Sequence, residues 1–258
     1  MRNVLTKFCG AALVSAVLSS SVFAGGTINI CSDKNLWYPF TFVEEGKAVG
    51  LQIDIISKAL SNLDYSVNYK PLPWKRCLAS AKDGDFDAIA TASYKDKRAV
   101  FLEYPNDAST AKKSVQRVLQ VEYVVVTASD SGYTYAGDVK TIPTPVRVPR
   151  GYSIGDDLKK QGLKVDDGAA GDENNIKKML RRGDGSVVTL PKIVELLSKQ
   201  DVYKGKLSVS DTPVKSKSYY LPFSKKSKIT KADQEKIWAE IANVRNDLEF
   251  MGKMSAKY

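Results

Sequence analysis

The sequence predicts an α/β protein that folds into two small lobes joined by extended strands. Strand and helix signals alternate in short steps over residues 27–92, and a second run of the same kind covers residues 145–200. Such alternation is typical of mainly parallel sheets with helices on their faces. Two long extended segments, residues 121–128 and 218–224, flank the second run. We expect them to carry the chain from one lobe to the other and back.

Residues 1–24 have the layout of a secretory signal peptide. Arg2 and Lys7 precede the apolar run "CGAALVSAVL", and "SSSVFA" ends at Ala24, after which we expect cleavage. The apolar part is too short to span a membrane, and no later stretch is long enough. We therefore expect the mature protein to be soluble, exported and periplasmic.

Export leaves Cys31 and Cys77 as the two cysteines of the mature chain. In an oxidising compartment such a pair favours a disulfide. The bond would close a loop of 46 residues and stabilise the fold by ~3–4 kcal/mol. Two free buried thiols are the alternative.

The chain contains no histidine, which excludes several kinds of site. A serine hydrolase with a histidine base and a cysteine nucleophile paired with histidine both need one. Zinc sites of the common kinds are excluded because only two mature cysteines accompany the missing histidine. We expect no metal and no cofactor. The formal net charge of +10 becomes +8 without Arg2 and Lys7, and the lysines are dispersed. This predicts a basic soluble surface and no nucleic-acid partner.

The first run predicts five elements in order. The segment "GLQIDIISKALSNL" has apolar residues at helical spacing, and Gly84 is placed to end a second helix. The expected elements are a strand at 27–32, a helix at 50–63, a strand at 65–72, a helix at 76–85 and a strand at 86–92.

The second run predicts a separate lobe. Its expected elements are a strand, a glycine turn and a helix at 145–162, a helix at 172–185, a strand at 186–190 and a helix at 191–200. Thereafter residues 218–227 are extended, and residues 229–254 form an amphipathic helix or helix pair that Thr230 caps. We assign residues 25–122 and 222–258 to lobe 1 and residues 123–221, with the crossover strands, to lobe 2.

Two segments carry a family resemblance, "ICSDKNLWYPFTFVEEGKAVGLQIDIISKAL" and "LPWKRCLASAKDGDFDAIATASYKDKR". A strand, an acidic residue, an aromatic-Pro-Phe step, a glycine turn and a helix opening "GLQIDI" follow in family order. The mature chain resembles the type II periplasmic solute-binding proteins, especially the family-3 amino-acid-binding branch. The resemblance implies the two-lobed type II periplasmic-binding-protein fold, with two interlobe strand crossovers and a ligand cleft between the lobes.

In that fold, strand ends and helix starts of the first lobe line one wall of the cleft, as in other open α/β sheets. Cys31 ends the first expected strand and Cys77 begins the second helix, so their disulfide would tie two cleft loops together. Trp74 would offer a flat apolar face and Arg76 a cation at the rim. A core indole and a surface salt bridge are the respective alternatives.

Asp33 lies where the family uses a carboxylate on the ligand's amino group, with the aromatic residues Trp37 and Tyr38 behind it. Arg98 lies where the family places an arginine that forks onto a ligand carboxylate. Its expected neighbours are Ala92, Ser93 and Tyr94. The alternative for Arg98 is an ion pair with Asp96 or Glu103.

In lobe 2, Gly151, Tyr152 and Ser153 take the place of the family's Gly-Ser/Thr-Ser/Thr at a helix start. Free backbone N–H groups there suit a carboxylate or another anion. Tyr152 replaces a small hydroxyl residue, which implies a different ligand shape. A plain helix cap at Ser153 is the alternative.

Thr189 and Leu190 stand where the family presents an aspartate to hold the ligand ammonium, and no acid follows before Glu195. We place Thr189 among the ligand-binding residues. The departure weakens the case for an ordinary α-amino acid and favours a carboxylate, or another small polar anion, with an apolar part.

The predicted function is a monomeric periplasmic receptor that binds a small, carboxylate-bearing, amino-acid-like molecule and hands it to an inner-membrane permease for ABC import. A receptor that reports to a membrane sensor is the first alternative. A periplasmic enzyme on the same fold, such as a dehydratase, is the second, and it needs a close acid/base carboxylate pair in the cleft.

Overall fold

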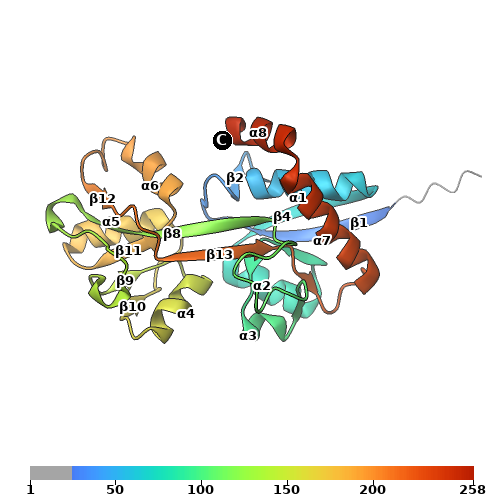
Figure 1. Ribbon diagram of the computed structural model, residues 1–258, viewed down its shortest axis with the longest axis horizontal. Coiled ribbons are helices and arrows are strands. Elements are labelled where there is room, and N and C mark those ends of the chain that lie inside the picture. Colours follow the sequence, from blue (N-terminus) through green and yellow to red (C-terminus); the bar gives the residue numbers. More distant parts are fainter. Residues whose placement is uncertain (1–24) are drawn as a thin grey trace, which may run out of the picture.

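The computed structural model describes residues 25–258, so the predicted signal peptide and its cleavage after Ala24 lie outside the described residues. Two groups of helices and strands lie side by side, and strands β8 and β13 run between them (Figure 1). This confirms the predicted two-lobed α/β fold. No helix in the described part of the chain is long and apolar enough to cross a bilayer.

Lobe 1 is built on a five-stranded sheet with the strand order β4-β1-β5-β14-β7. Its strands are β1 (Gly25–Asp33), β4 (Tyr65–Leu72), β5 (Ala88–Ala90), β7 (Leu102–Glu103) and β14 (Phe223–Ser224). The helices are α1 (Leu51–Asn62), α2 (Trp74–Asp83), α3 (Asp96–Ala99), α7 (Lys231–Asn246) and α8 (Leu248–Lys257). The neighbours of β1 are parallel to it, which puts the carboxyl ends of three strands at one edge.

Lobe 2 contributes most of a second sheet, with the order β10-β9-β11-β8-β13-β6 and with β12 paired to β8. Its strands are β8 (Leu119–Ala128), β9 (Val146–Arg147), β10 (Val165–Asp166), β11 (Ser186–Thr189), β12 (Leu207–Val209) and β13 (Lys215–Tyr220), and β6 (Ala92–Ser93) joins from lobe 1. The helices are α4 (Ser153–Lys160), α5 (Asp172–Arg182) and α6 (Pro191–Ser198), with 3-10 turns at Ser129–Ser131 and Val139–Thr141.

The two connections between the lobes are the paired strands β8 and β13. They run antiparallel, with Leu119 opposite Tyr219 and Tyr123 opposite Lys215. β13 then meets β6 of lobe 1, so both connections enter that lobe together. The crossovers lie at the predicted places, and the lobe boundaries at residues 122 and 221 stay predictions.

Each lobe has its own apolar core, which explains the helical spacing seen in the sequence. In lobe 1, α1 and α7 pack together over the sheet through Ile55, Leu60 and Ile241, all fully buried. Burying such a side chain stabilises the fold by ~1.5–3 kcal/mol. In lobe 2, Ile176 of α5 and Leu197 of α6 are buried in the second apolar core.

Several element boundaries differ from the prediction. Helix α2 begins at Trp74, two residues earlier than expected, because Pro73 occupies its N-cap. The C-terminal segment is a helix pair: the Thr230 side chain caps α7, and Asp247 ends α7 and caps α8. The hairpin of β2 (Phe42–Glu44) and β3 (Lys47–Val49) was not predicted, since three-residue strands leave no clear period.

The predicted disulfide is present. Cys31 in β1 is bonded to Cys77 in α2, with the two Cα atoms 5.6 Å apart. Both residues are fully buried in lobe 1. The bond therefore ties β1, an inner strand of the lobe 1 sheet, to the helix that begins at Trp74.

Replacing both cysteines by alanine should lower the free energy of unfolding by ~3–4 kcal/mol, because the unfolded chain regains the freedom of a 46-residue loop. Urea unfolding followed by circular dichroism measures the change. Wild-type protein unfolded with a reductant present should match the variant. Equal stability of the oxidised wild type and the variant would contradict the assignment.

Candidate functional site

A cavity of about 30 Å³ lies at the seam between the lobes. Residues from both lobes and from a crossover strand line it: Asp33, Trp37, Thr41, Trp74, Ala90, Thr91, Arg98, Tyr152, Ser153 and Tyr219. This volume holds roughly two water molecules. A ligand of the size of a carboxylic acid can therefore enter only when the lobes move apart.

Element ends bring these side chains together. Asp33 is the last residue of β1, and Trp74 is the first residue of α2. Ser153 opens α4, and Tyr152 is its N-cap. The carboxyl ends of parallel strands and the amino ends of helices thus meet at the seam, the usual place for a ligand in an open α/β sheet.

Arg98 is a buried cation whose recorded partners are neutral. It is 3% exposed. Its Nη1 donates to the Ser93 carbonyl at 3.0 Å, and its Nη2 donates to the Gly151 carbonyl at 3.3 Å. The guanidinium lies 5.1 Å from the ring centre of Trp74. Its buried Nε has no hydrogen-bond partner in the described structure.

The alternative interpretation of Arg98 is wrong, because within residues 25–258 it makes no ion pair with Asp96 or Glu103. A charge taken out of water needs compensation. The present hydrogen bonds of Arg98 run from the charged guanidinium to neutral oxygens, whereas a carboxylate would add a counter-charge and could accept two parallel N–H bonds.

Asp33 lies at the other end of the cavity, beside Tyr152. Its Oδ2 accepts a hydrogen bond from the Tyr152 hydroxyl at 2.6 Å. The backbone N–H of Asn35 donates to Oδ1 at 3.1 Å, and the Asn35 amide donates to Oδ2 at 3.3 Å. Burial raises the pKa of Asp33, and these hydrogen bonds oppose the rise only in part.

A second acid, Asp172 at the start of α5, lies on the lobe 2 side of this end. Burial raises its pKa to about 7, and the negative charge of Asp33 adds to the rise. The hydroxyl of Thr189 approaches the carboxyl and works in the opposite direction. The charge of Asp33 thus acts on Asp172 across the seam.

Direct hydrogen bonds join the lobes. The Trp74 indole N–H donates to the Gly151 carbonyl at 3.1 Å, and the hydroxyls of Ser93 and Ser153 lie 2.7 Å apart. Gly151 has a φ of +79°, and a Cβ there would lie 3.3 Å from the Lys75 side chain. Glycine is required at this turn because the backbone is left-handed and lobe 1 approaches it closely.

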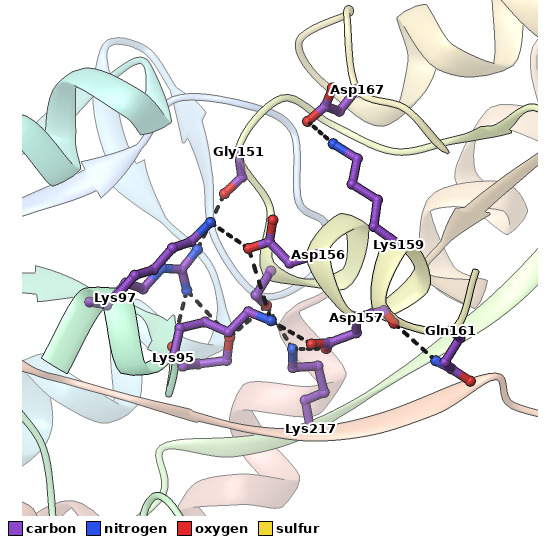
Figure 2. A network of polar contacts seen from close by, with 12 residues as sticks. Lys95, Lys97, Gly151, Asp156, Asp157, Lys159, Gln161, Asp167 and Lys217 are labelled. Carbon is purple, nitrogen blue, oxygen red and sulfur yellow. Dashed lines mark hydrogen bonds and ion pairs between the residues drawn. The ribbon is translucent and has the colours of Figure 1, made fainter. Parts of the chain in front are cut away.

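Beside the cavity, ion pairs add to these bonds (Figure 2). Lys95 of lobe 1 and Lys217 of β13 each lie 2.5 Å from the Asp157 carboxylate, and Lys97 lies 2.6 Å from Asp156. Burial of Asp157 disfavours its charge, but Lys217 and Lys95 outweigh this and hold its pKa below the ordinary value. Burial lowers the pKa of Lys217 to about 8.

The structure brings most of the predicted site residues together. Asp33, Trp37, Trp74, Arg98, Tyr152 and Ser153 line the cavity, and Ser93 and Gly151 accept the bonds of Arg98. Trp74 is thus a cleft residue as well as a buried one. Ligand contact by these side chains stays a prediction.

Besides Ser93 and Gly151, five predicted site residues lie outside the cavity lining. The Tyr38 hydroxyl points to the carbonyl of Tyr258, and Arg76 is exposed on the outer face of α2. Tyr94 packs edge-on against Tyr104, and Ala92 is fully buried in β6. Thr189 is buried at the end of β11, where its hydroxyl approaches Asp172.

Sequence reasoning missed other residues of the seam. Thr41, Ala90, Thr91 and Tyr219 line the cavity, and Asp172 lies behind Tyr152. The adjacent aromatic residues Tyr219 and Tyr220 in an extended segment are the sequence feature that could have indicated Tyr219 as a site residue. Asp172 gave only the common signal of an acid in the first turn of a helix.

Within residues 25–258, no cluster of three or more cysteines, aspartates or glutamates is arranged to hold a metal ion.

Comparison with known proteins agrees with this geometry. The bacterial extracellular solute-binding proteins, family 3, match residues 28–243 of the chain. Curated protein sequences give no match. Among solved structures, a histidine kinase sensor domain with similarity to periplasmic binding proteins has a TM-score of 0.72 at 14% identity, covering 91% of this chain and 96% of its own.

Two binding proteins are similarly related. An ancestral arginine-binding protein bound to arginine has a TM-score of 0.68 at 17% identity, over 91% of this chain and 99% of its own. The arginine-, lysine-, histidine-binding protein ArtJ from Geobacillus stearothermophilus has a TM-score of 0.68 at 18% identity, over 90% and 94%. Likeness at these identities shows the fold.

Asp172 should make the protein less stable as the pH rises. Its pKa is about 7 when folded against an ordinary value of 3.8, so the fold favours the protonated form. The free energy of unfolding should fall between pH 4 and 7 and level off above. Measured by urea unfolding, the free energy of unfolding should fall less steeply with rising pH in Asp172→Asn than in wild type. Glu173→Gln, the neighbouring acid, should keep the wild-type slope; an unchanged slope in Asp172→Asn would refute the assignment.

Proposed function

The chain belongs to the bacterial extracellular solute-binding proteins of family 3, and we propose that it is a periplasmic receptor for a small carboxylate-bearing molecule. One observation carries the proposal: Arg98 is buried at the seam between the lobes, and its acceptors are the uncharged carbonyls of Ser93 and Gly151 and the Ser93 hydroxyl. A ligand carboxylate supplies the charge that these acceptors lack.

The other lining groups suit the rest of such a ligand. The Ser153 hydroxyl lies at the cavity and can donate to a carboxylate, while the Thr91 hydroxyl, also at the cavity, already donates to Gln52. The rings of Trp37, Trp74 and Tyr219 offer apolar surface, with Trp37 and Tyr219 4.7 Å apart between ring centres. Few polar groups on a mainly aromatic wall are typical of small-molecule sites.

Binding takes place through opening and closing of the lobes. The closed seam leaves a cavity of about 30 Å³, so the hydrogen bonds that now join Arg98 and Trp74 to Gly151 must break for a ligand to enter. The lobes then close on the ligand, because it touches both walls only in the closed state.

For the partner, we propose an inner-membrane permease of an ABC importer that receives the ligand from a monomeric receptor. A membrane sensor is the alternative, and the likeness to a histidine kinase sensor domain is a likeness of fold. Permease genes beside the coding sequence favour import, and a sensor gene favours signalling.

An enzyme on this fold remains a second candidate because of one observation. Asp33 and Asp172 are two buried acids on opposite sides of the seam, both with raised pKa values, and a dehydratase needs such acids as an acid/base pair. A receptor returns its ligand unchanged. Prolonged incubation of the ligand with excess protein, followed by mass spectrometry, distinguishes the two, since an enzyme converts the ligand.

Arg98→Ala should weaken ligand binding at least tenfold, because it leaves the carboxylate buried and unpaired. Arg98→Lys should restore binding only in part, since an ammonium cannot fork onto two oxygens. Mass spectrometry of small molecules released from natively purified protein identifies the ligand, with refolded protein as the blank. Calorimetric titration then measures its affinity for each variant.

Arg76→Ala is the matched control, because Arg76 is exposed on the same lobe. It should bind as the wild type does. Wild-type affinity in Arg98→Ala, or a released molecule without an acidic group, would overturn the proposal.

A further inference from the structure

Two buried carboxyl groups, one from each lobe, neighbour the Tyr152 side chain: Asp33 accepts a hydrogen bond from its hydroxyl, and Asp172 faces it from lobe 2. Asp33 is 6% exposed and Asp172 is 3% exposed. Asn35 donates twice to Asp33, and its Oδ1 lies 3.8 Å from the position of a Cβ on Gly171, the residue before Asp172. The loop after β1 thus touches the loop before α5.

No lysine or arginine within residues 25–258 makes an ion pair with either acid. The titratable groups that face Asp172 are Asp33, Tyr152 and Tyr123, none of which carries positive charge. Two buried carboxyls without a cation are unfavourable when both are ionised. A positively charged group with several N–H donors would satisfy both.

The Tyr152 hydroxyl now fills this place. It donates to Asp33 at 2.6 Å, which is the bond that a ligand's N–H would make. A phenol has one proton to donate, so it serves one of the two acids. Tyr152 comes from lobe 2, and parting of the lobes withdraws it from Asp33.

The side chain of Tyr152 also sets the distance between the two ends of the site. Arg98 donates to the carbonyl of Gly151, next to the backbone of Tyr152, while Asp33 accepts from the far tip of the ring. The places for an anion and for a cation are therefore separated by about the length of a tyrosine side chain.

The acids near Arg98 do not line the cavity. Among the described residues that line the cavity, Asp33 is the one acid. Asp156 and Asp157 lie beside the seam, where lysines pair with them. An ammonium adjacent to a carboxylate on Arg98 would therefore meet aromatic rings and hydroxyls, whereas an ammonium at the remote end would meet Asp33 and, once the Tyr152 hydroxyl is displaced, Asp172.

Resting on the proposed function, we infer that the ligand is a zwitterion with its cationic group remote from its carboxylate, in the class of ω-amino and ω-guanidino acids. Its carboxylate binds Arg98. Its cation displaces the Tyr152 hydroxyl and binds between Asp33 and Asp172. Asp172 is then a specificity residue, because it distinguishes the remote position of the cation from the adjacent one.

Calorimetric titration with isomeric probes tests this directly. 5-Aminopentanoate and its isomer norvaline have the same atoms and charges and differ only in the position of the ammonium. 6-Aminohexanoate and norleucine form a second such pair, and pentanoate lacks the cation. At least one ω-isomer should bind wild-type protein tenfold or more tightly than its 2-amino isomer and than pentanoate.

Asp172→Asn should weaken binding of that ω-isomer at least tenfold and leave pentanoate binding within about twofold, whereas Glu173→Gln should change neither. Proton release gives a second readout. A bound cation favours the ionised form of Asp172, so binding at pH 6 should release about one proton in wild type and less in Asp172→Asn. Titrations in two buffers of different ionisation enthalpy measure the release.

The failures are distinguishable. If the probes bind without preference for the ω-isomer, or if Asp172→Asn binds like wild type, the inference is wrong and the proposed receptor function stands. If neither pentanoate nor any amino acid of the panel binds wild type, the inference is overturned, and the small molecules released from purified protein decide the receptor function separately.

Discussion

A guanidinium buried against neutral acceptors is the constraint on which the cleft depends. Arg98 donates to a carbonyl of its own lobe, at Ser93, and to one of the opposite lobe, at Gly151. Desolvating a charge without a counter-charge costs free energy that the fold must offset elsewhere. Placing that charge where the lobes meet makes the seam selective for anions, since only a closed cleft with an anion compensates it fully.

Contacts between the two lobes hold the cleft closed, and they use groups that a ligand would otherwise contact. Tyr152 donates to Asp33, Trp74 donates to Gly151, and Lys95 pairs with Asp157. A ligand shifts the balance between open and closed states only through what it adds to these contacts. A ligand can add the most stabilising contacts at Arg98 and at the two acids Asp33 and Asp172, because none of these groups makes an ion pair in the described structure.

The sequence was sufficient for features that depend on local patterns. Periodicity predicted the lobes, the even cysteine count predicted the disulfide, and Thr230 predicted a helix start. Features that depend on the opposite lobe were beyond it. Asp172 looked like an ordinary first-turn acid, because its burial arises from contact with the loop after β1. Tyr38 was misplaced because it packs against Tyr258, which lies 220 residues later in the chain.

The distance between the lobes tests the central claim, that an anion on Arg98 closes the cleft. Spin labels at Ser61→Cys in lobe 1 and Gln200→Cys in lobe 2 lie at exposed sites away from the seam. In protein freed of small molecules by refolding, pulsed electron spin resonance should show a longer distance between the two labels than in the ligand-bound protein. Adding back the released fraction should shorten it in wild type and leave it unchanged in Arg98→Ala. The same shortening in both proteins, or no change in wild type, would contradict the account.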